Sequence, residues 1–487
     1  MKLLSVIRKI VLLTNPHWPF NLVNKLPYKF AILQFIQFSR QFPEIHALYL
    51  RHGMVYENWQ PGLSDIDLTV VIKDEQEWDS EFHFLLAFWQ KFQRIRKWLP
   101  MLTDVNILSL RQMKAWTGFT ISGYEARDWQ KIFGKECPRE ADTGFPADRF
   151  RDALNHAFVV YQWILLPLFH HPIDKGSLAR LRLLRIANKI IRYGIRYQNS
   201  DQVNTLFCHD SMDDIAMIAN TLYNLERYVV QFSSKNNPGT SASTDLFPPW
   251  HELDEEFSNS QITSSLQEIL PFLVSIYRES GRDFVILQAD LTLAELEHTV
   301  RILKHSATAG LHSQVILTMP MFKYALAYYC PDLYASLRWK RNLLWGKDSV
   351  YHLPAPSLKS FTWQLLDSMG KALNFAQSEA FFTIKGRDVN LCDDLVRAVA
   401  QLLKLRLYFD KGIVRIYKRQ WHEELAKYYP VDFTNLAHIK ERAQIDSLQD
   451  RMYCYKVIRN HSDMVCRLFE HVAHSTNHEL FTWYSIS

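Results

Sequence analysis

The sequence predicts an α+β protein, in which a small mixed sheet with helices is followed by predominantly α-helical domains. Over the first 110 residues, apolar residues switch between helical spacing and short runs rich in β-branched residues. After residue 145 strand signals become rare and long amphipathic patterns take over. Glycine is also scarce, at 15 of 487 residues, which favours helices over a loop-rich β architecture.

The first domain, 1–145, is expected to alternate helix and strand. Helical spacing covers 27–45 and 78–98, and the second of these ends before Pro100. Strand-like runs cover 46–50, 65–72 and 101–110. A polar loop with the turn-forming pair Pro61-Gly62 joins the first two strands.

The rest of the chain is expected to be helical, with one domain over 146–235 that lines the cleft and one or more C-terminal domains over 250–487. Amphipathic patterns cover 147–197 and 211–232 in the first and most of 253–347 and 356–478 in the second. Residues 233–249 have the composition of a linker and mark the expected boundary. No internal repeat is apparent in the sequence.

Composition excludes several classes of protein. With 48% hydrophobic and 22% charged residues the chain is globular, and its length exceeds what one core normally holds. The net charge of +5 does not by itself indicate a nucleic-acid partner. The six cysteines are far apart and form no CxxC or Cys/His cluster, so free thiols in a reducing compartment are expected rather than disulfides or a zinc site.

The N-terminus and the longest apolar run predict a cytoplasmic protein without a membrane partner. Arg8 and Lys9 interrupt the first apolar run, and no small-residue cleavage site follows Leu13. The apolar run 157–169 contains Pro167 and is shorter than the roughly 20 residues that cross a bilayer.

Three carboxylates carry the chemical hypothesis. Asp65 and Asp67 are two residues apart on a predicted strand, so their side chains are expected on one face. Two such carboxylates repel each other unless a cation lies between them, and Mg²⁺ or Mn²⁺ suits oxygen ligands. Asp104 lies inside an apolar strand, where a charge is costly unless it is paired or bound to metal. The alternative for the first pair is a solvated strand edge with Asp65 capping a turn.

The run from Gly53 through Ser64-Asp65-Ile66-Asp67-Leu68 resembles the signature of the DNA polymerase beta-like nucleotidyltransferase superfamily, and especially its antibiotic-modifying and minimal members. That signature has a glycine pair or Gly-Ser, then about ten residues, then Asp-x-Asp between apolar residues, with a third acid on a later strand. The segment 131–136 (KIFGKE) resembles one that often closes this domain. The resemblance covers roughly residues 28–140. One departure is Met54, where the family usually has Gly or Ser.

The resemblance implies a metal-dependent transfer of a nucleoside monophosphate, AMP from ATP, to an acceptor hydroxyl with release of pyrophosphate. Asp65 and Asp67 would bind the metal ions that hold the triphosphate, and Asp104 would complete the metal site or take the hydroxyl proton. Gly53 and Ser64 would lie against the nucleotide. The acceptor stays open among a small polar molecule, an antibiotic, a protein side chain and an RNA end, and so does the oligomeric state. The alternative is an inactive member that senses nucleotide or masks a partner, which Met54 favours.

A basic helix within 175–197 is a further candidate. Arg185, Lys189, Arg192 and Arg196 follow one helical face, and the first two are expected near the nucleotide. The alternative is a solvated basic face. Two other hypotheses remain: a helical RNA-cleaving domain that uses Arg151 and His156, and a scaffold in which the acid pair is incidental.

Overall fold

The computed structural model describes residues 10–15, 17, 19–55, 59, 61–62, 64–74, 77–113, 129–137, 149–170, 178–195, 207–235, 257–258, 266, 268–279, 281–305, 311, 314–330, 333–334, 337, 343–350, 353, 373–383, 400, 403, 407, 418–431, 434 and 448–474. The chain divides into two compact units. The first comprises Met1–Ala147, Leu365–Val414 and Lys418–Ser487, and the second comprises Asp148–Gln364 and Arg415–Tyr417. None of the helices described is long and apolar enough to cross a membrane.

The first unit contains the predicted mixed sheet. Its elements are α2 (Phe20–Val23), α3 (Leu26–Ser39), β1 (Ile45–Leu50), the 3-10 turn η1 (His52–Met54), β2 (Asp67–Ile72), α4 (Trp78–Trp98), β3 (Asp104–Ser109) and β4 (Gln130–Gly134). The strand order is β3-β2-β1-β4. The pair β2 and β3 is parallel, because α4 carries the chain back between them, and the other pairs are antiparallel.

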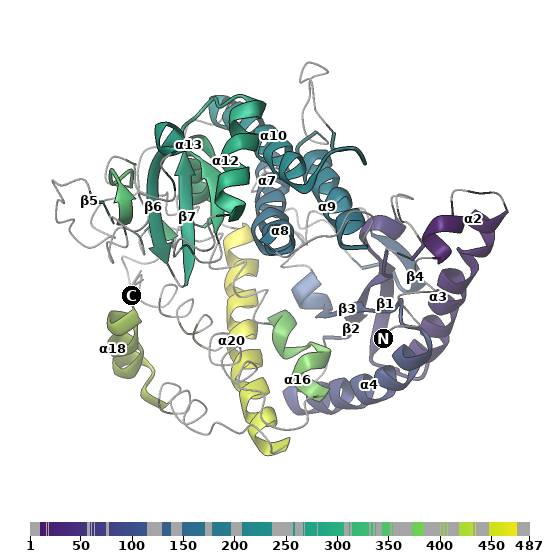
Figure 1. Ribbon diagram of the computed structural model, residues 1–487. Coiled ribbons are helices and arrows are strands. Elements are labelled where there is room, and N and C mark those ends of the chain that lie inside the picture. The colour runs from purple at the N-terminus through teal and green to yellow at the C-terminus, as the bar shows by residue number, and fades with distance from the viewer. Residues whose placement is uncertain are drawn as a thin grey trace. The chain divides into compact units, whose positions relative to one another are not determined.

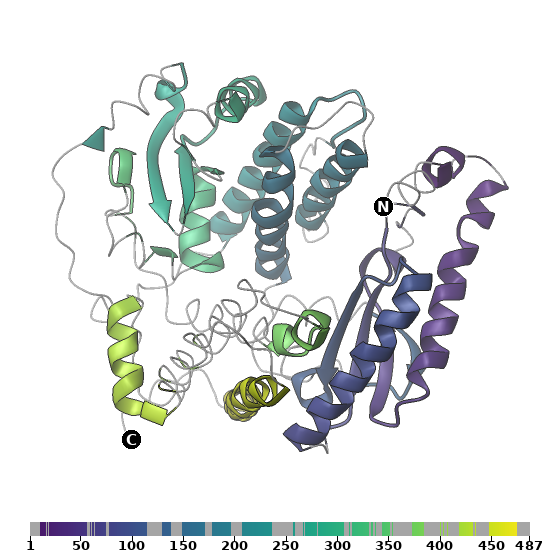
Figure 2. The ribbon, with the colours of Figure 1, turned by 60° about the horizontal axis from the view of Figure 1, so that its bottom comes forward.

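An aromatic layer joins the two helices to each other over the sheet. Phe35 and Phe38 of α3 meet Phe88 and Phe92 of α4, with ring centroids 5.2–6.5 Å apart. These residues recur at helical spacing and all four are buried. Figure 2 shows the two helices, in purple and dark blue, side by side along the sheet.

The C-terminal part of the chain returns to this first unit. It contributes the helix at 373–376 and α16 (Glu379–Thr383), α18 (Lys418–Tyr428) and α20 (Leu448–His474). Both α16 and α20 pack against α4. Residues 250–487 are therefore shared between the two units, whereas the sequence analysis assigned this stretch to C-terminal domains of its own.

The second unit begins with helices and then forms a second sheet (Figure 1). The helical elements are α7 (Arg149–Val160), the π-turn Tyr161–Leu165, α8 (Leu166–His170), α9 (Leu178–Ile195) and α10 (Asp214–Lys235). The later elements are β5 (Phe257–Ser258), the 3-10 turn Leu270–Phe272, β6 (Leu273–Glu279), β7 (Arg282–Leu287), α12 (Leu293–His305), β8 (Val315–Thr318), α13 (Met319–Tyr324), the π-turn Ala325–Tyr329 and β9 (Leu343–Gly346). The strand order is β5-β9-β6-β7-β8, and β7 and β8 are parallel.

This sheet was not expected from the sequence, in which strand signals nearly vanish beyond residue 145, although most of the described elements there are helical as predicted. The strands β6 and β7 are almost wholly buried, so they lack the polar alternation that marks a half-exposed strand. The expected boundary at 233–249 does not separate two cores either, because one apolar cluster runs from Leu154 on α7 to Val350 after β9. Ser233 to Lys235 end α10, and the remainder of that stretch lies outside the described residues.

Candidate metal and nucleotide site

Two of the three predicted acids begin neighbouring strands. Asp67 is the first residue of β2 and Asp104 the first residue of β3. In the parallel register of these strands, Asp67 is paired directly with Asp104. The backbone therefore places both acids at the same edge of the sheet. The side chain of Asp104 is not among those described.

The third acid, Asp65, lies beside the same edge. Ile66 is fully buried, and its N–H donates to the carbonyl of Met101 at 2.8 Å. This bond joins the residues just before β2 to those just before β3. Asp65 is exposed, and its Oδ2 accepts a hydrogen bond from Thr103 Oγ1 at 2.7 Å. Asp67 is half-buried. The two carboxylates thus flank one buried residue, as expected for positions two apart in an extended segment.

The described side chains alone do not complete a metal centre. Among them, no group of three His, Cys, Asp or Glu is arranged to hold an ion. Asp104 is absent from that search, although its backbone stands beside Asp67. The donor chemistry at this edge is carboxylate oxygen, which suits Mg²⁺ or Mn²⁺.

A tyrosine that the sequence did not single out supports the approach to Asp65. Tyr28 is a buried residue of α3. Its hydroxyl donates to the carbonyl of Ser64 at 2.8 Å and accepts from the N–H of Gly62 at 3.0 Å. Gly62 has φ +87°, which fits the turn predicted from Pro61-Gly62, because a type II turn needs positive φ at its third residue. Ser64, predicted to lie against the nucleotide, is itself buried.

Replacing Tyr28 by Phe should loosen this segment without removing any ligand. A buried carbonyl and a part-buried N–H would each lose a partner, and we expect a loss of about 1–3 kcal/mol in the free energy of unfolding. We also expect weaker metal-dependent nucleotide binding, since Asp65 follows the tethered residue directly. Denaturant unfolding and calorimetric titration measure the two effects. The control is Tyr223→Phe, at a tyrosine that packs against Arg227 in the second unit. Unchanged binding in the Tyr28 variant would contradict a positioning role.

The turn that holds Gly53 starts next to Asp67. Gly53 is a half-buried residue of η1, immediately after β1. The N–H of Arg51 donates to the carbonyl of Asp67 at 3.0 Å. Arg51 is 5% exposed, and its guanidinium lies 5.9 Å from the centroid of the Trp129 ring. The backbone of Arg51 thus joins the end of β1 to Asp67, while its guanidinium is buried against Trp129.

The predicted basic residues belong to the other unit. Arg185 and Lys189 are half-buried on α9, which packs against α7 and α10. Arg192 on the same helix is exposed, and Arg196 lies outside the described residues. Their expected place near the nucleotide stays a prediction. His156 is a half-buried residue of α7, and the Arg151 side chain is outside the described part.

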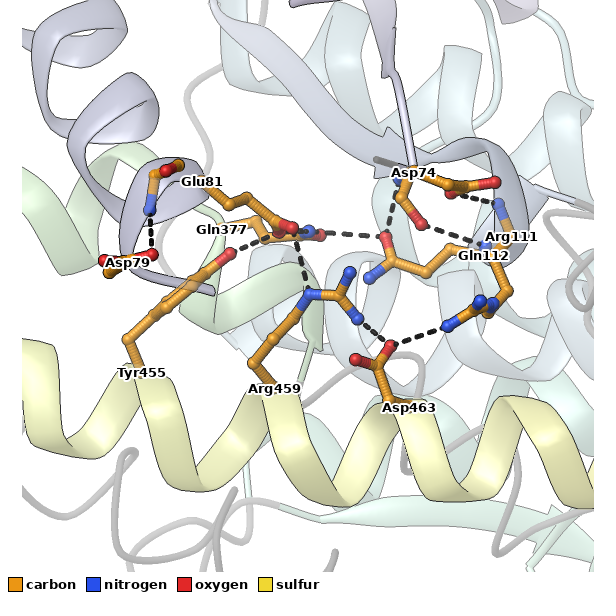
Figure 3. A network of polar contacts seen from close by, with 11 residues as sticks. Asp74, Asp79, Glu81, Arg111, Gln112, Gln377, Tyr455, Arg459 and Asp463 are labelled. Carbon is orange, nitrogen blue, oxygen red and sulfur yellow. Dashed lines mark hydrogen bonds and ion pairs between the residues drawn. The ribbon is translucent and has the colours of Figure 1, made fainter. Parts of the chain in front are cut away.

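A second polar cluster in the first unit lies at the opposite end of the strands (Figure 3). Asp74 follows β2, and its Oδ1 accepts from the N–H of Arg111, which follows β3, at 2.7 Å. Arg111 also pairs with Asp463 of α20 at 3.5 Å. The acids Asp67 and Asp104 start the same strands, so this cluster and the acid edge are separated by the length of β2 and β3.

The centre of this cluster is a buried ion pair between α4 and α20. Glu81 of α4 is fully buried, and its Oε2 accepts from Arg459 Nε at 3.0 Å. Tyr455 also donates to Glu81, and Arg459 pairs with Asp463. Figure 3 shows these three α20 side chains projecting from one face of the helix. Gln377 Nε2 donates to Glu81 Oε1 at 3.3 Å. We call Glu81, Gln377, Tyr455, Arg459 and Asp463 the α4–α20 network, because its contacts join α4 to α20.

Neither a model of a protein family, nor a curated protein, nor a solved structure matches this chain.

Proposed function

We propose that the protein is a metal-dependent nucleotidyltransferase that moves a nucleoside monophosphate, AMP from ATP, to an acceptor hydroxyl. The observation that carries the proposal is the direct parallel pairing of Asp67 with Asp104, with Asp65 beside the same edge. Two local sequence features that are far apart in the chain, an Asp-x-Asp pair and an acid in an apolar strand, converge at one place.

Each residue of the proposed site would have a separate role. Asp65, Asp67 and Asp104 would hold Mg²⁺ or Mn²⁺ against the triphosphate, and the metal would screen the phosphates and stabilise the leaving oxygen. Arg51, whose backbone N–H donates to Asp67, would add positive charge to this end of the sheet and so favour an anionic ligand. The acceptor oxygen would form a bond to the α-phosphorus as the bond from that phosphorus to pyrophosphate breaks. A carboxylate, with Asp104 as the first candidate, would take the hydroxyl proton.

A second candidate function is a nucleotide-sensing or interaction module on the same fold. Met54 favours it, since a half-buried methionine occupies the turn position where the resembled signature has Gly or Ser. The two candidates share a nucleotide site and differ in turnover. The acceptor is the remaining choice, among small molecules, protein side chains and RNA ends.

Thermal melting of the full chain with each of the four common nucleoside triphosphates tests the shared site. With Mg²⁺ present we expect one nucleotide, ATP first, to raise the melting temperature, and EDTA to cancel the shift. A ligand at about 100 times its dissociation constant stabilises by about 2.7 kcal/mol, which a melt resolves. No metal-dependent shift with any of the four at millimolar concentration would contradict the proposal.

A further inference from the structure

Four strands of the second sheet repeat the topology of the first sheet, and β5 is an additional strand. The order β3-β2-β1-β4 in the first unit corresponds to β8-β7-β6-β9 in the second. In each, the first two strands form an antiparallel pair, a helix crosses over to a parallel third strand, and the fourth strand pairs antiparallel with the first. The crossover helices are α4 and α12.

The correspondence extends to the register of single residues. Ala47 of β1 pairs with Gly134 of β4, and Ser275 of β6 pairs with Gly346 of β9. The register then shifts at the same point in both pairs, just before Tyr49 in β1 and just before Tyr277 in β6. A register shift of this kind can occur at many positions along a strand pair, so its repetition at the matching residue supports a common origin for the two sheets.

The two glycines at these pairs have the same backbone requirement. Gly134 has φ +82° and Gly346 has φ +83°. A Cβ on Gly134 would lie 2.1 Å from the carbonyl oxygen of His46, and one on Gly346 would lie 2.3 Å from that of Val274. His46 and Val274 are themselves matching residues of β1 and β6. Both positions therefore exclude any side chain for the same reason.

A tyrosine hydroxyl makes the same contact in both units. Tyr49 accepts from the N–H of Cys137 at 2.8 Å, and Tyr277 accepts from the N–H of Ser349 at 2.6 Å. Each donor lies three residues after its glycine. Burial raises the pKa of both tyrosines. The surrounding segments also match in sequence, as Ile-Phe-Gly-Lys-Glu at 132–136 and Leu-Trp-Gly-Lys-Asp at 344–348.

The second and third strands correspond in the same way. The end of β2 (Val-Val-Ile) and the end of β7 (Val-Ile-Leu) occupy equal register positions against their neighbours. A buried hydroxyl residue ends each third strand, Ser109 in β3 and Thr318 in β8.

The acids are what the second copy lacks. The register places Arg282 at the position of Asp67, because the pair Glu279 and Arg282 stands where Arg51 and Asp67 stand. In the sequence, the residue two before Arg282 is Ser280, and the residue two before Val315, the first residue of β8, is Ser313, so neither count reaches an acid. Residues 52–66, which carry Gly53, correspond in the sequence to the two residues between Glu279 and Arg282, Ser280 and Gly281.

We infer that the second unit contains a degenerate copy of the nucleotidyltransferase-type core, and that the protein holds one metal and nucleotide site per chain, in the first copy. The site half of this inference rests on the proposed function. Arg282 places a cation where the metal-binding carboxylate would be, and it repels a divalent ion. Its guanidinium lies 3.6 Å from the centroid of the Trp163 ring, so the position is used for packing within the second unit.

Calorimetric titration of the full chain with ATP and Mg²⁺, repeated with GTP, CTP and UTP, tests the number of sites. We expect one site per chain, no measurable binding by Asp67→Asn, and unchanged stoichiometry and affinity for Arg282→Gln. Two sites in the native chain would overturn the inference. So would residual binding in Asp67→Asn that disappears when Arg282→Gln is added. In both cases the proposed function survives.

Absence of binding by the native chain would instead overturn the proposed function. Amide hydrogen exchange would then still test whether the second unit repeats the core of the first. Tyr49→Phe should remove protection of the Cys137 amide, and Tyr277→Phe should remove protection of the Ser349 amide. Each variant should leave the other unit unchanged. Loss of protection in only one of the two would show that the contacts are not equivalent and would overturn the duplicated core.

Discussion

Replacing Asp67 by Asn should abolish metal-dependent nucleotide binding and transfer while the first unit stays folded. The amide has the size of the carboxylate but no charge, so a divalent cation loses a ligand that it binds mainly by electrostatic attraction. We expect a loss of about a thousandfold or more in kcat/KM, which corresponds to about 4 kcal/mol at the transition state. The fold should tolerate the change, because Asp67 is half-buried at the start of β2 and its backbone keeps the pairing with Asp104.

Pyrophosphate release and thermal melting together measure this effect. The matched control is Asp79→Asn, an exposed acid in the first turn of α4 whose Oδ1 accepts only a local hydrogen bond from the N–H of Ser80. Asp79→Asn should keep both the metal-dependent shift and turnover. Turnover within tenfold of the native chain in the Asp67 variant would exclude the mechanism. A shift that persists without turnover in the native protein would support the sensing module instead.

The first sheet could be predicted because its signals are local. Trp78 to Trp98 repeats apolar residues at helical spacing and ends before a proline, and the structure has that helix with the same bounds. The strand with the acid pair was placed within two residues, since β2 begins at Asp67 rather than Asp65. The pairing of this strand with the one that begins at Asp104 could not be predicted, because the sequence does not show which strands are neighbours in the sheet.

The second sheet escaped prediction although β6 and β7 are as buried as β1 and β2 and at least as long. Residues 273–287 form two apolar runs around Ser280-Gly281, a two-residue turn typical of a hairpin, and this was the signal available. The duplication left little trace outside the segments around Gly134 and Gly346, because a fold constrains burial and register more than it constrains side-chain identity. The hydrogen bonds of Tyr28 and the α4–α20 network join residues far apart in the chain, so no local sequence pattern predicts them.

Away from the acid edge, substitutions in the α4–α20 network should reduce the stability of the protein more than any others. Glu81 is fully buried and Arg459 is 4% exposed, so removing one of them leaves the other charge desolvated without its main partner. For Glu81→Gln or Arg459→Met we expect a loss of about 3–5 kcal/mol in the free energy of unfolding. Burial alone would lower the pKa of Arg459, but the charges of Glu81 and Asp463 outweigh it and raise that pKa, so the guanidinium stays protonated.

The double variant separates an ion pair from simple packing. Because Glu81→Gln with Arg459→Met removes both charges together, it should be destabilised by less than the sum of the single variants. Denaturant unfolding gives the three values, and Lys456→Met, at an exposed lysine of α20 over the Trp78 ring, is the control, with an expected loss of about 1 kcal/mol or less. Additive losses would mean that the two charges act independently. Coupled losses, with amide protection falling first along α20, would show that this ion pair attaches the C-terminal helix to the first unit. Because that helix follows the second unit in the chain, the first unit completes its fold only after the second unit has been synthesised.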